Sequence, residues 1–242
     1  IHGGDINFNY WTDDHKHKLN VYTSLQDTRR DSYYGSGMDP NAYGSTHDLV
    51  VLGGAQYTLG INKLLFMPAE FMVGAEYNYN YLRDITLGYD HDYLQKVNIY
   101  SGFVQNEWRN DKWGFLIGAR IDKHSLVDDV IVSPRANIRF NPSKKMNFRL
   151  SYSTGFRAPQ AFDEDFHIAV VGGERVVTVL ADGLKEESSH SFSLSGDFYF
   201  NIGEVQTNFL VEGFYTTLSD VFALRTIGQD AVGNDVLERY NG

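Results

Sequence analysis

The sequence predicts an all-β protein, an antiparallel up-and-down transmembrane β-barrel to which this chain contributes about ten to eleven strands. Two features of the 242 residues carry the prediction. Apolar and polar side chains alternate with a period of two over most of the chain, as they do in strands with one apolar and one polar face. Short and long connections follow one another between the alternating segments, which is typical of membrane barrels.

Residues 146–155 show the alternation clearly, with Met146, Phe148 and Leu150 on one face and Asn147 and Arg149 on the other. Several segments exceed the roughly 5–6 residues of an average strand and reach the about 9–11 that cross a bilayer at a tilt. Length therefore favours a membrane barrel over a soluble sandwich. The predicted strands are residues 6–10, 18–25, 48–59, 71–81, 95–108, 113–122, 135–140, 146–155, 189–201 and 205–216, with another beginning at 236–240.

The connections differ in length in a regular order. The short ones are residues 12–16, 60–70, 109–112, 141–145 and 201–204, and the mostly longer ones are 26–47, 85–94, 125–130, 155–188 and 219–235. Outer-membrane barrels have short turns on the periplasmic side and long loops on the outside. The pattern therefore predicts that residues 155–188 form an external loop and that Asn110 and Asp111 lie in a periplasmic turn.

Aromatic residues are frequent, with 16 Tyr, 16 Phe and 3 Trp. Those near predicted strand ends are Trp11, Trp108, Trp113, Tyr152, Phe198 and Phe200. Membrane barrels place aromatic girdles at both interfaces. The aromatic core of a soluble β-sandwich would show the same alternation, so strand length and loop asymmetry decide for the membrane.

Composition excludes several classes of function. A net charge of −10 disfavours nucleic-acid binding, and the absence of cysteine excludes thiol catalysis and Cys-ligated metals. No nucleophile elbow, metalloprotease helix or phosphate loop is present, so we expect neither an enzyme nor a cofactor. No apolar run approaches the roughly 20 residues of a membrane helix. Because the chain opens at Ile1 within a predicted strand, we expect a piece of a longer polypeptide.

Four stretches form a more specific pattern: FVQNEW at residues 103–108, WGFLIGARID at 113–122, LSYSTGFRAPQ at 150–160 and LKEES at 184–188. In this order and spacing the chain resembles the barrel of TonB-dependent outer-membrane receptors. Those barrels often carry a strand ending in Gly-Phe-Arg-Ala-Pro, an external loop, and a Leu-Lys-Pro-Glu-x-Ser element opening the next strand. The chain departs from that pattern at residues 185–187, which lack the proline, and at its end, which lacks the family's terminal aromatic strand.

The resemblance implies a 22-stranded barrel with an N-terminal plug, of which residues 1–242 would be a partial barrel domain without the plug and the last strands. It implies a receptor of the bacterial cell outer membrane that takes up a scarce bulky nutrient, such as a ferric siderophore, haem or cobalamin. The implied partners are this small-molecule ligand, the energy-coupling protein TonB acting through the plug, and outer-membrane lipid, with no nucleic acid. Two alternatives stay open: a passive porin-like barrel and a soluble β-sandwich binding module.

Candidate ligand-binding residues lie in the predicted external loops. Phe156, Arg157 and Gln160 mark the exit from a strand into the longest loop, and Pro159, which lacks a backbone N–H, suits such an exit. Arg157 either holds the loop against nearby acids or binds an anionic ligand through two parallel hydrogen bonds. In another loop, Tyr33 and Tyr34 either grip an organic ligand or seal the barrel mouth.

Asp163, Glu164, Asp165 and His167 form an acidic cluster in the longest predicted loop. Three carboxylates could bind Ca²⁺ through oxygen ligands, but no calcium-loop pattern accompanies them, and a solvated acidic loop is the favoured interpretation. His167 could instead ligate haem iron, as loop histidines do in the haem receptors that the segment also resembles. Those receptors carry an Asn-Pro-x-Leu element where this chain has ADGL at residues 181–184, so we predict no metal site.

Charged residues on the polar faces of the predicted strands are expected to line the barrel lumen. We expect them to pair with one another or with a plug. They are Glu76, Arg120, Asp122, Arg135, Arg139, Arg149, Asp197 and Glu212.

Overall fold

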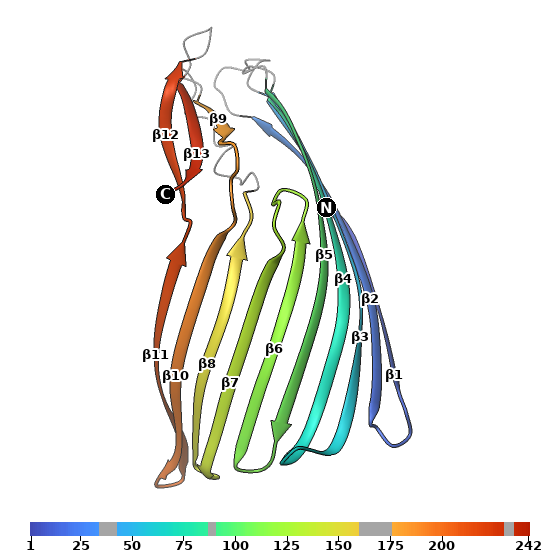
Figure 1. Ribbon diagram of the computed structural model, residues 1–242, viewed down its shortest axis with the longest axis vertical. Coiled ribbons are helices and arrows are strands. Elements are labelled where there is room, and N and C mark those ends of the chain that lie inside the picture. The colour runs from blue at the N-terminus through green and yellow to red at the C-terminus, as the bar shows by residue number, and fades with distance from the viewer. Residues whose placement is uncertain (34–42, 87–90, 160–175, 230–234) are drawn as a thin grey trace.

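Ten strands form one continuous sheet in the computed structural model, which describes residues 1–33, 43–86, 91–159, 176–229 and 235–242. In Figure 1 the strands lie side by side, and β1 to β4 are turned edge-on, so the sheet is curved. Its order is β1-β2-β3-β4-β5-β6-β7-β8-β10-β11. The bounds are β1 His2–Trp11, β2 His17–Tyr33, β3 Tyr43–Leu64, β4 Met67–Thr86, β5 His91–Arg109, β6 Trp113–His124, β7 Ile131–Ser143, β8 Met146–Arg157, β10 Glu187–Ile202 and β11 Val205–Ser219.

Every pair of neighbours in this sheet is antiparallel, which confirms the predicted all-β, antiparallel architecture. The short turns lie together at one end of the sheet (Figure 1). One of them joins β10 to β11 through Gly203, whose φ of +63° is a left-handed conformation that glycine adopts without strain. The described residues contain no helix long and apolar enough to cross a membrane.

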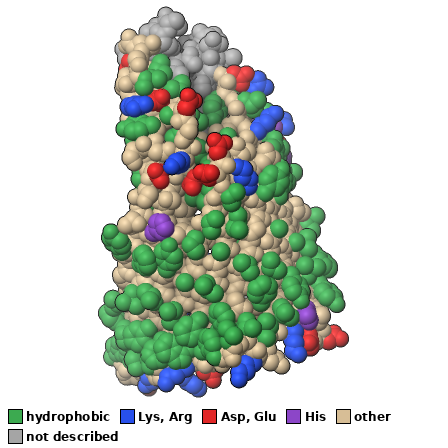
Figure 2. All heavy atoms as spheres, in the orientation of Figure 1, with side chains coloured by type: hydrophobic (Ala, Val, Ile, Leu, Met, Phe, Trp, Pro, Cys, Tyr) green, Lys and Arg blue, Asp and Glu red, His purple; other side chains and the backbone are tan. Residues whose placement is uncertain are grey.

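The register places side chains of like polarity in rows across the sheet. Leu19, Tyr57, Val73, Val104 and Ala119 are successive cross-strand partners in β2 to β6, so they form an apolar row on one face. Residues one position further along each strand point to the opposite face. Figure 2 shows apolar side chains gathered over the lower part of the face in view, with charged side chains above them and along the lower rim.

The sheet has almost no apolar core of its own. Among the described residues, the buried apolar side chains are few: Ala69, Val97, Val127, Ile131, Ala158 and Pro159. Phe192 and Leu194, in the middle of β10, remain 49% and 59% exposed. A soluble sandwich would pack its apolar faces on each other, whereas an apolar band left uncovered by the protein is the lipid-facing surface of a barrel wall.

The strands extend further than the sequence predicted. β2 runs to Tyr33 and β3 begins at Tyr43, inside the predicted loop 26–47, and β4 reaches Thr86, inside the predicted loop 85–94. The predicted turn 60–70 contains only Leu65 and Phe66 between β3 and β4. Residues such as 27–32 (DTRRDS) are polar on both faces, so the hydropathy no longer alternates although the backbone stays extended.

A second sheet, of the order β12-β13-β9, lies beyond the end opposite the short turns (Figure 1). β12 (Phe222–Gln229) follows β11 almost end to end, and β13 (Asp235–Asn241) contains the strand start predicted at 236–240. The sequence prediction was wrong for β12 and for β9 (Val176–Leu180), which it assigned to loops. Both strands are short, and their pairing with β13 is a contact between distant segments that local alternation does not encode.

Candidate functional site

A network of charged and hydroxyl groups lies on the face opposite the apolar rows, here called the lumenal face. Arg120 on β6 lies at its centre, and its guanidinium donates to Glu76 Oε1 at 2.8 Å, to Asp122 Oδ1 at 2.8 Å and to Ser101 Oγ at 2.7 Å. The Tyr22 hydroxyl donates to the other oxygen of Glu76 at 2.7 Å. The network therefore ties β2, β4, β5 and β6 together across the lumenal face.

Glycines on the lumenal face make room for the aromatic rings beside this network. A Cβ added to Gly54 would lie 2.6 Å from the Tyr22 ring, and one added to Gly74 would lie 2.4 Å from the Phe103 ring and 2.8 Å from the carbonyl oxygen of Ala55. Both rings therefore lie close against the neighbouring strands. This position brings the Tyr22 hydroxyl to Glu76, and a β-carbon at Gly54 would prevent it.

The sequence analysis identified Glu76, Arg120 and Asp122 as lumenal, and the register places them there. It missed Tyr22 and Ser101. The signal was present for Tyr22, because it lies between Val21 and Thr23 and so falls on the polar face of a strand whose apolar residues have odd numbers. For Ser101 no local signal distinguishes it from other serines in strands.

Three further lumenal arginines have a different environment. Arg139 on β7 and Arg149 on β8 are directly opposite each other, and Arg135 lies four residues before Arg139 on the same strand. Among the described residues none of the three forms an ion pair, in contrast to Arg120. Their contacts are neutral: Arg135 donates to the side-chain oxygen of Gln105, and Arg139 Nη2 donates to the carbonyl oxygen of Asn110 at 3.3 Å.

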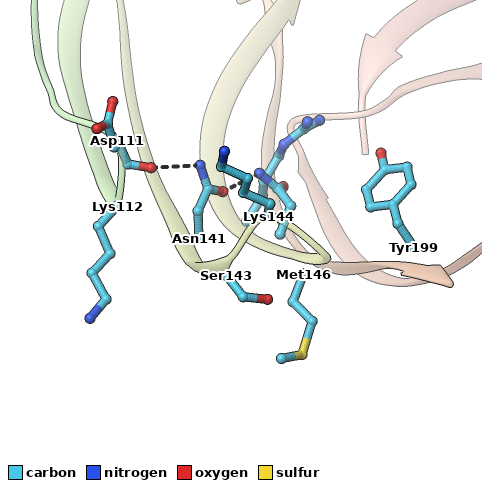
Figure 3. A pocket seen from close by; sticks show the side chains of 9 residues that line it. Asp111, Lys112, Asn141, Ser143, Lys144, Met146 and Tyr199 are labelled. Atoms are coloured by element: carbon cyan, nitrogen blue, oxygen red, sulfur yellow. Dashed lines mark hydrogen bonds between the residues drawn. The ribbon is translucent and has the colours of Figure 1, made fainter.

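A cavity of about 390 Å³ opens beside Arg149 at the end of the sheet where the short turns lie. Figure 3 shows it between the β5–β6 turn, which carries Asp111 and Lys112, and the β7–β8 turn, which carries Lys144. Asn141 joins the two turns by donating to the carbonyl oxygen of Asp111 at 3.2 Å. The cavity wall thus contains three cationic side chains and one carboxylate.

At the opposite end of the sheet, Arg157 holds the start of the small second sheet against the large one. Its Nε lies 3.1 Å from Glu187 Oε2, and its guanidinium carbon lies 5.3 Å from the centre of the Phe222 ring. Glu187 Oε1 accepts a hydrogen bond from the backbone N–H of Phe222 at 2.5 Å. These contacts correspond to the first of the two roles predicted for Arg157, holding the local structure against an acid.

Two other predicted site residues occupy this end. Phe156 packs against the small cluster of Val127, Ile131 and Ala158, so its side chain contributes to local packing. Tyr33, the last residue of β2, stacks at a tilt on Tyr43, the first of β3, with ring centres 4.8 Å apart. Both tyrosines are exposed, at 38% and 50%.

The remaining predicted site residues lie outside the described residues. They are Tyr34, Gln160, Asp163, Glu164, Asp165 and His167. Within the described ranges, no group of three or more His, Cys, Asp or Glu side chains is arranged to hold a metal ion.

The extended parts of β2 to β5 carry an ionic cluster that the sequence analysis missed. Arg83 donates two hydrogen bonds to Asp92, at 2.9 and 2.7 Å, and His47 Nε2 lies 2.9 Å from Asp27 Oδ2. The hydrogen bonds and charge of Asp92 raise the pKa of the Arg83 guanidinium above its ordinary value. These pairs stabilise strands that continue beyond the apolar band.

A curved antiparallel sheet with an apolar outer band, charged lumenal side chains and short turns at one end defines the wall of a membrane-spanning β-barrel. A family model described as TonB dependent receptor-like, beta-barrel, matches residues 2–241. The chain therefore belongs to this family, as its resemblance predicted. The family is one of receptors and transporters rather than enzymes.

Solved structures of this family have the same fold. The siderophore receptor PirA from Acinetobacter baumannii has a TM-score of 0.70 at 15% identity, with 99% of this chain matching 40% of that one. The ferric enterobactin receptor PfeA from Pseudomonas aeruginosa has a TM-score of 0.73 at 15% sequence identity, and the match covers 99% of this chain and 38% of that one. The FrpB iron transporter from Neisseria meningitidis has a TM-score of 0.67 at 15% sequence identity, and the match covers 99% of this chain and 38% of that one. The chain thus spans about two fifths of these structures, and no curated protein matches it in sequence.

Proposed function

We propose that this chain is part of the barrel of a TonB-dependent receptor that takes up a ferric siderophore across the bacterial outer membrane. The family match over residues 2–241 is the observation that carries the proposal. The solved structures similar in fold are named as a siderophore receptor, a ferric enterobactin receptor and an iron transporter, which favours iron over cobalamin as the cargo.

The proposed route uses the polar lumenal face and energy supplied by TonB through a plug. A bulky solute crosses a barrel only if the lumen is wide and lined by polar groups, and the ten described strands are too few to close a barrel of that width. Lumenal side chains such as Glu76 and Arg120 would then face the plug and the transport path.

We also propose that the external end of the strands first contacts the ligand. The exposed side chains of Tyr33 and Tyr43 offer a flat aromatic surface to an organic chelator. The Arg157 side chain is 49% exposed and offers a cation to an anionic chelator. The proposed contacts include the loop residues Tyr34, Phe156, Gln160, Asp163, Glu164, Asp165 and His167.

Uptake by the full-length receptor tests the proposal. A strain lacking the receptor gene would be supplied with radioactive iron as catecholate or hydroxamate chelates or as haem, and with labelled cobalamin. We expect energy-dependent uptake of a ferric chelate that is restored by the gene and lost in a strain without TonB. Uptake that persists without TonB would support a passive porin instead, and absence of the protein from the outer membrane would support a soluble module.

A further inference from the structure

The lumenal face carries a basic patch whose members form no ion pair with the acids of the described chain. We define the patch as Arg135, Arg139 and Arg149 together with Lys112 and Lys144 at the adjoining turns. Arg139 and Arg149 are directly opposite on β7 and β8, and like charges in this position destabilise a strand pair. No member of the patch forms an ion pair within the described residues, although six other arginines of the chain do.

Arg139 provides the strongest sign that a partner is missing. Its Nε is buried and has no hydrogen-bond partner in the described structure, and its Nη2 contacts only a neutral carbonyl oxygen. A buried N–H of a guanidinium without an acceptor is costly, because desolvation of a cation is offset only by an anion or by several acceptors. Gly114 is directly opposite on β6, and a Cβ added to it would lie 3.3 Å from this Nε, so the Arg139 side chain lies against the neighbouring strand.

The nearby acids form no ion pair with the patch within the described residues, and the one carboxylate of the cavity wall, Asp111, faces three cations. Asp197 on β10 accepts from Asn208 at 3.4 Å, and Glu212 on β11 is two strands away from Arg149, with Ser195 between them. Arg120 shows what a lumenal arginine does where carboxylates are present, since it binds both Glu76 and Asp122. The patch differs from Arg120 in its surroundings and not in its residue type.

We propose that the basic patch docks an acidic segment of polypeptide that enters the lumen at the end with the short turns. Arg135 and Arg139 are four residues apart, about 13 Å at roughly 3.3 Å per residue, and Lys144 lies further along at the turn. One small anion cannot contact positions so widely spaced. An extended or looped chain with several Asp or Glu residues can, and the 390 Å³ cavity beside Arg149 has room for such side chains.

This inference deepens the proposed function, because in a receptor of that kind the segment belongs to the plug. It states a property that the family match does not give, namely that the plug surface facing β6 to β8 carries carboxylates. It also predicts that high salt weakens plug seating on this side, since exposed charge pairs are screened.

Cross-linking of the full-length receptor in outer-membrane vesicles tests the inference. A water-soluble carbodiimide activates a carboxylate, which then forms an amide with a lysine amine in contact with it while the carbodiimide leaves as a urea. Peptide mapping by mass spectrometry would follow native Lys112 and Lys144 and the variant Arg149→Lys. Lys63, exposed near the end of β3 and outside the patch, is the internal control.

We expect Lys144 and the lysine of Arg149→Lys to be joined to Asp or Glu residues of one segment outside residues 1–242, and Lys63 not to be joined to it. The double variant Arg139→Gln/Arg149→Gln should lose most of the Lys144 cross-link while the barrel keeps its heat-modifiable gel mobility. Cross-links only to barrel acids such as Asp197 would overturn the inference. The inference would also be overturned if no peptide cross-link formed and added citrate protected Lys144 against an acetylating reagent, because the occupant would then be a small anion. Uptake is measured separately, so a cross-linked receptor that transports no chelate would contradict the proposed function and not the basic-patch inference.

Discussion

Replacing Arg120 by leucine should destabilise the barrel more than any surface arginine replacement. The variant loses three hydrogen bonds and leaves two carboxylates without their cation. The side chain of Asp122 is only 1% exposed, and its second oxygen, Oδ2, has no hydrogen-bond partner in the described structure. Removing one partner of a buried ion pair costs about 3–5 kcal/mol, but Arg120 and Glu76 are 37% and 20% exposed to the lumen, so screening reduces the expected loss to about 2–3 kcal/mol.

Equilibrium urea unfolding of the full-length protein in lipid vesicles, followed by tryptophan fluorescence, would measure the loss. A double-mutant cycle of Arg120→Leu with Asp122→Asn isolates the interaction, and we expect a coupling of about 1–2 kcal/mol. The matched control is Arg83→Leu, because the Arg83–Asp92 pair is half exposed and screened by solvent, so its loss should have a much smaller effect on the free energy of unfolding. A coupling indistinguishable from zero, or equal losses for the two arginines, would refute the assignment of Arg120 as the centre of a stabilising network.

Three further outcomes are expected. Gly74→Val should destabilise the barrel by about 1–3 kcal/mol through overpacking against the opposing aromatic ring and strand, whereas Gly102→Val, which has open space around its Cβ, should be nearly neutral in the same unfolding assay. Arg157→Leu should increase proteolytic cleavage around residues 220–242, because the Phe222 ring at the start of the small sheet loses its contact with the guanidinium, and Glu187, which accepts from the Phe222 N–H, loses its cation; an unchanged digestion pattern would contradict this role. Hydrogen bonds from the Thr12 hydroxyl and a backbone N–H lower the pKa of Asp14 in the β1–β2 turn below its ordinary 3.8. Because the folded-state pKa of Asp14 lies below the unfolded one, the ionised carboxylate stabilises the turn at pH values above the unfolded pKa, and this stabilisation is lost as the pH falls through the folded pKa. The protection of the amides of residues 12–16, taken as the intrinsic exchange rate divided by the observed rate at each pH, should therefore fall on acidification. Thr12→Val should reduce this pH dependence, while the hydrogen bond from the Lys16 N–H remains.

The core of each strand could be predicted from local sequence because its two faces differ in polarity. Residues 146–155 alternate throughout, and β8 is found at Met146–Arg157. The prediction failed where that contrast disappears. Residues 27–32 are polar on both faces and were assigned to a loop, although cross-strand pairing continues from Asp27 through Tyr33. Outside the apolar band, strand structure is maintained by a partner strand, which the local sequence does not reveal.

The candidate site shows the same division. The polar face of each strand identified Arg120 and Arg149 as lumenal, yet it could not distinguish them. One is surrounded by carboxylates and the other faces Arg139, and the difference arises from which residues the register places opposite. Likewise Arg157 could be recognised as the end of a strand, but its partners Glu187 and Phe222 lie 30 and 65 positions further along the chain.

By itself, the sequence determined that the chain is a series of long antiparallel strands with one apolar and one polar face, and it contained the motifs of the receptor family. Those properties depend on residue types at spacings of one and two, which a single strand displays. The tertiary structure decided which charges meet. Tyr22 reaches Glu76 across 54 residues of sequence, and a register shift of one residue would turn either side chain to the lipid. Because register is set by pairing between whole strands and by the turns between them, the arrangement of the lumenal charges became visible only in the folded sheet.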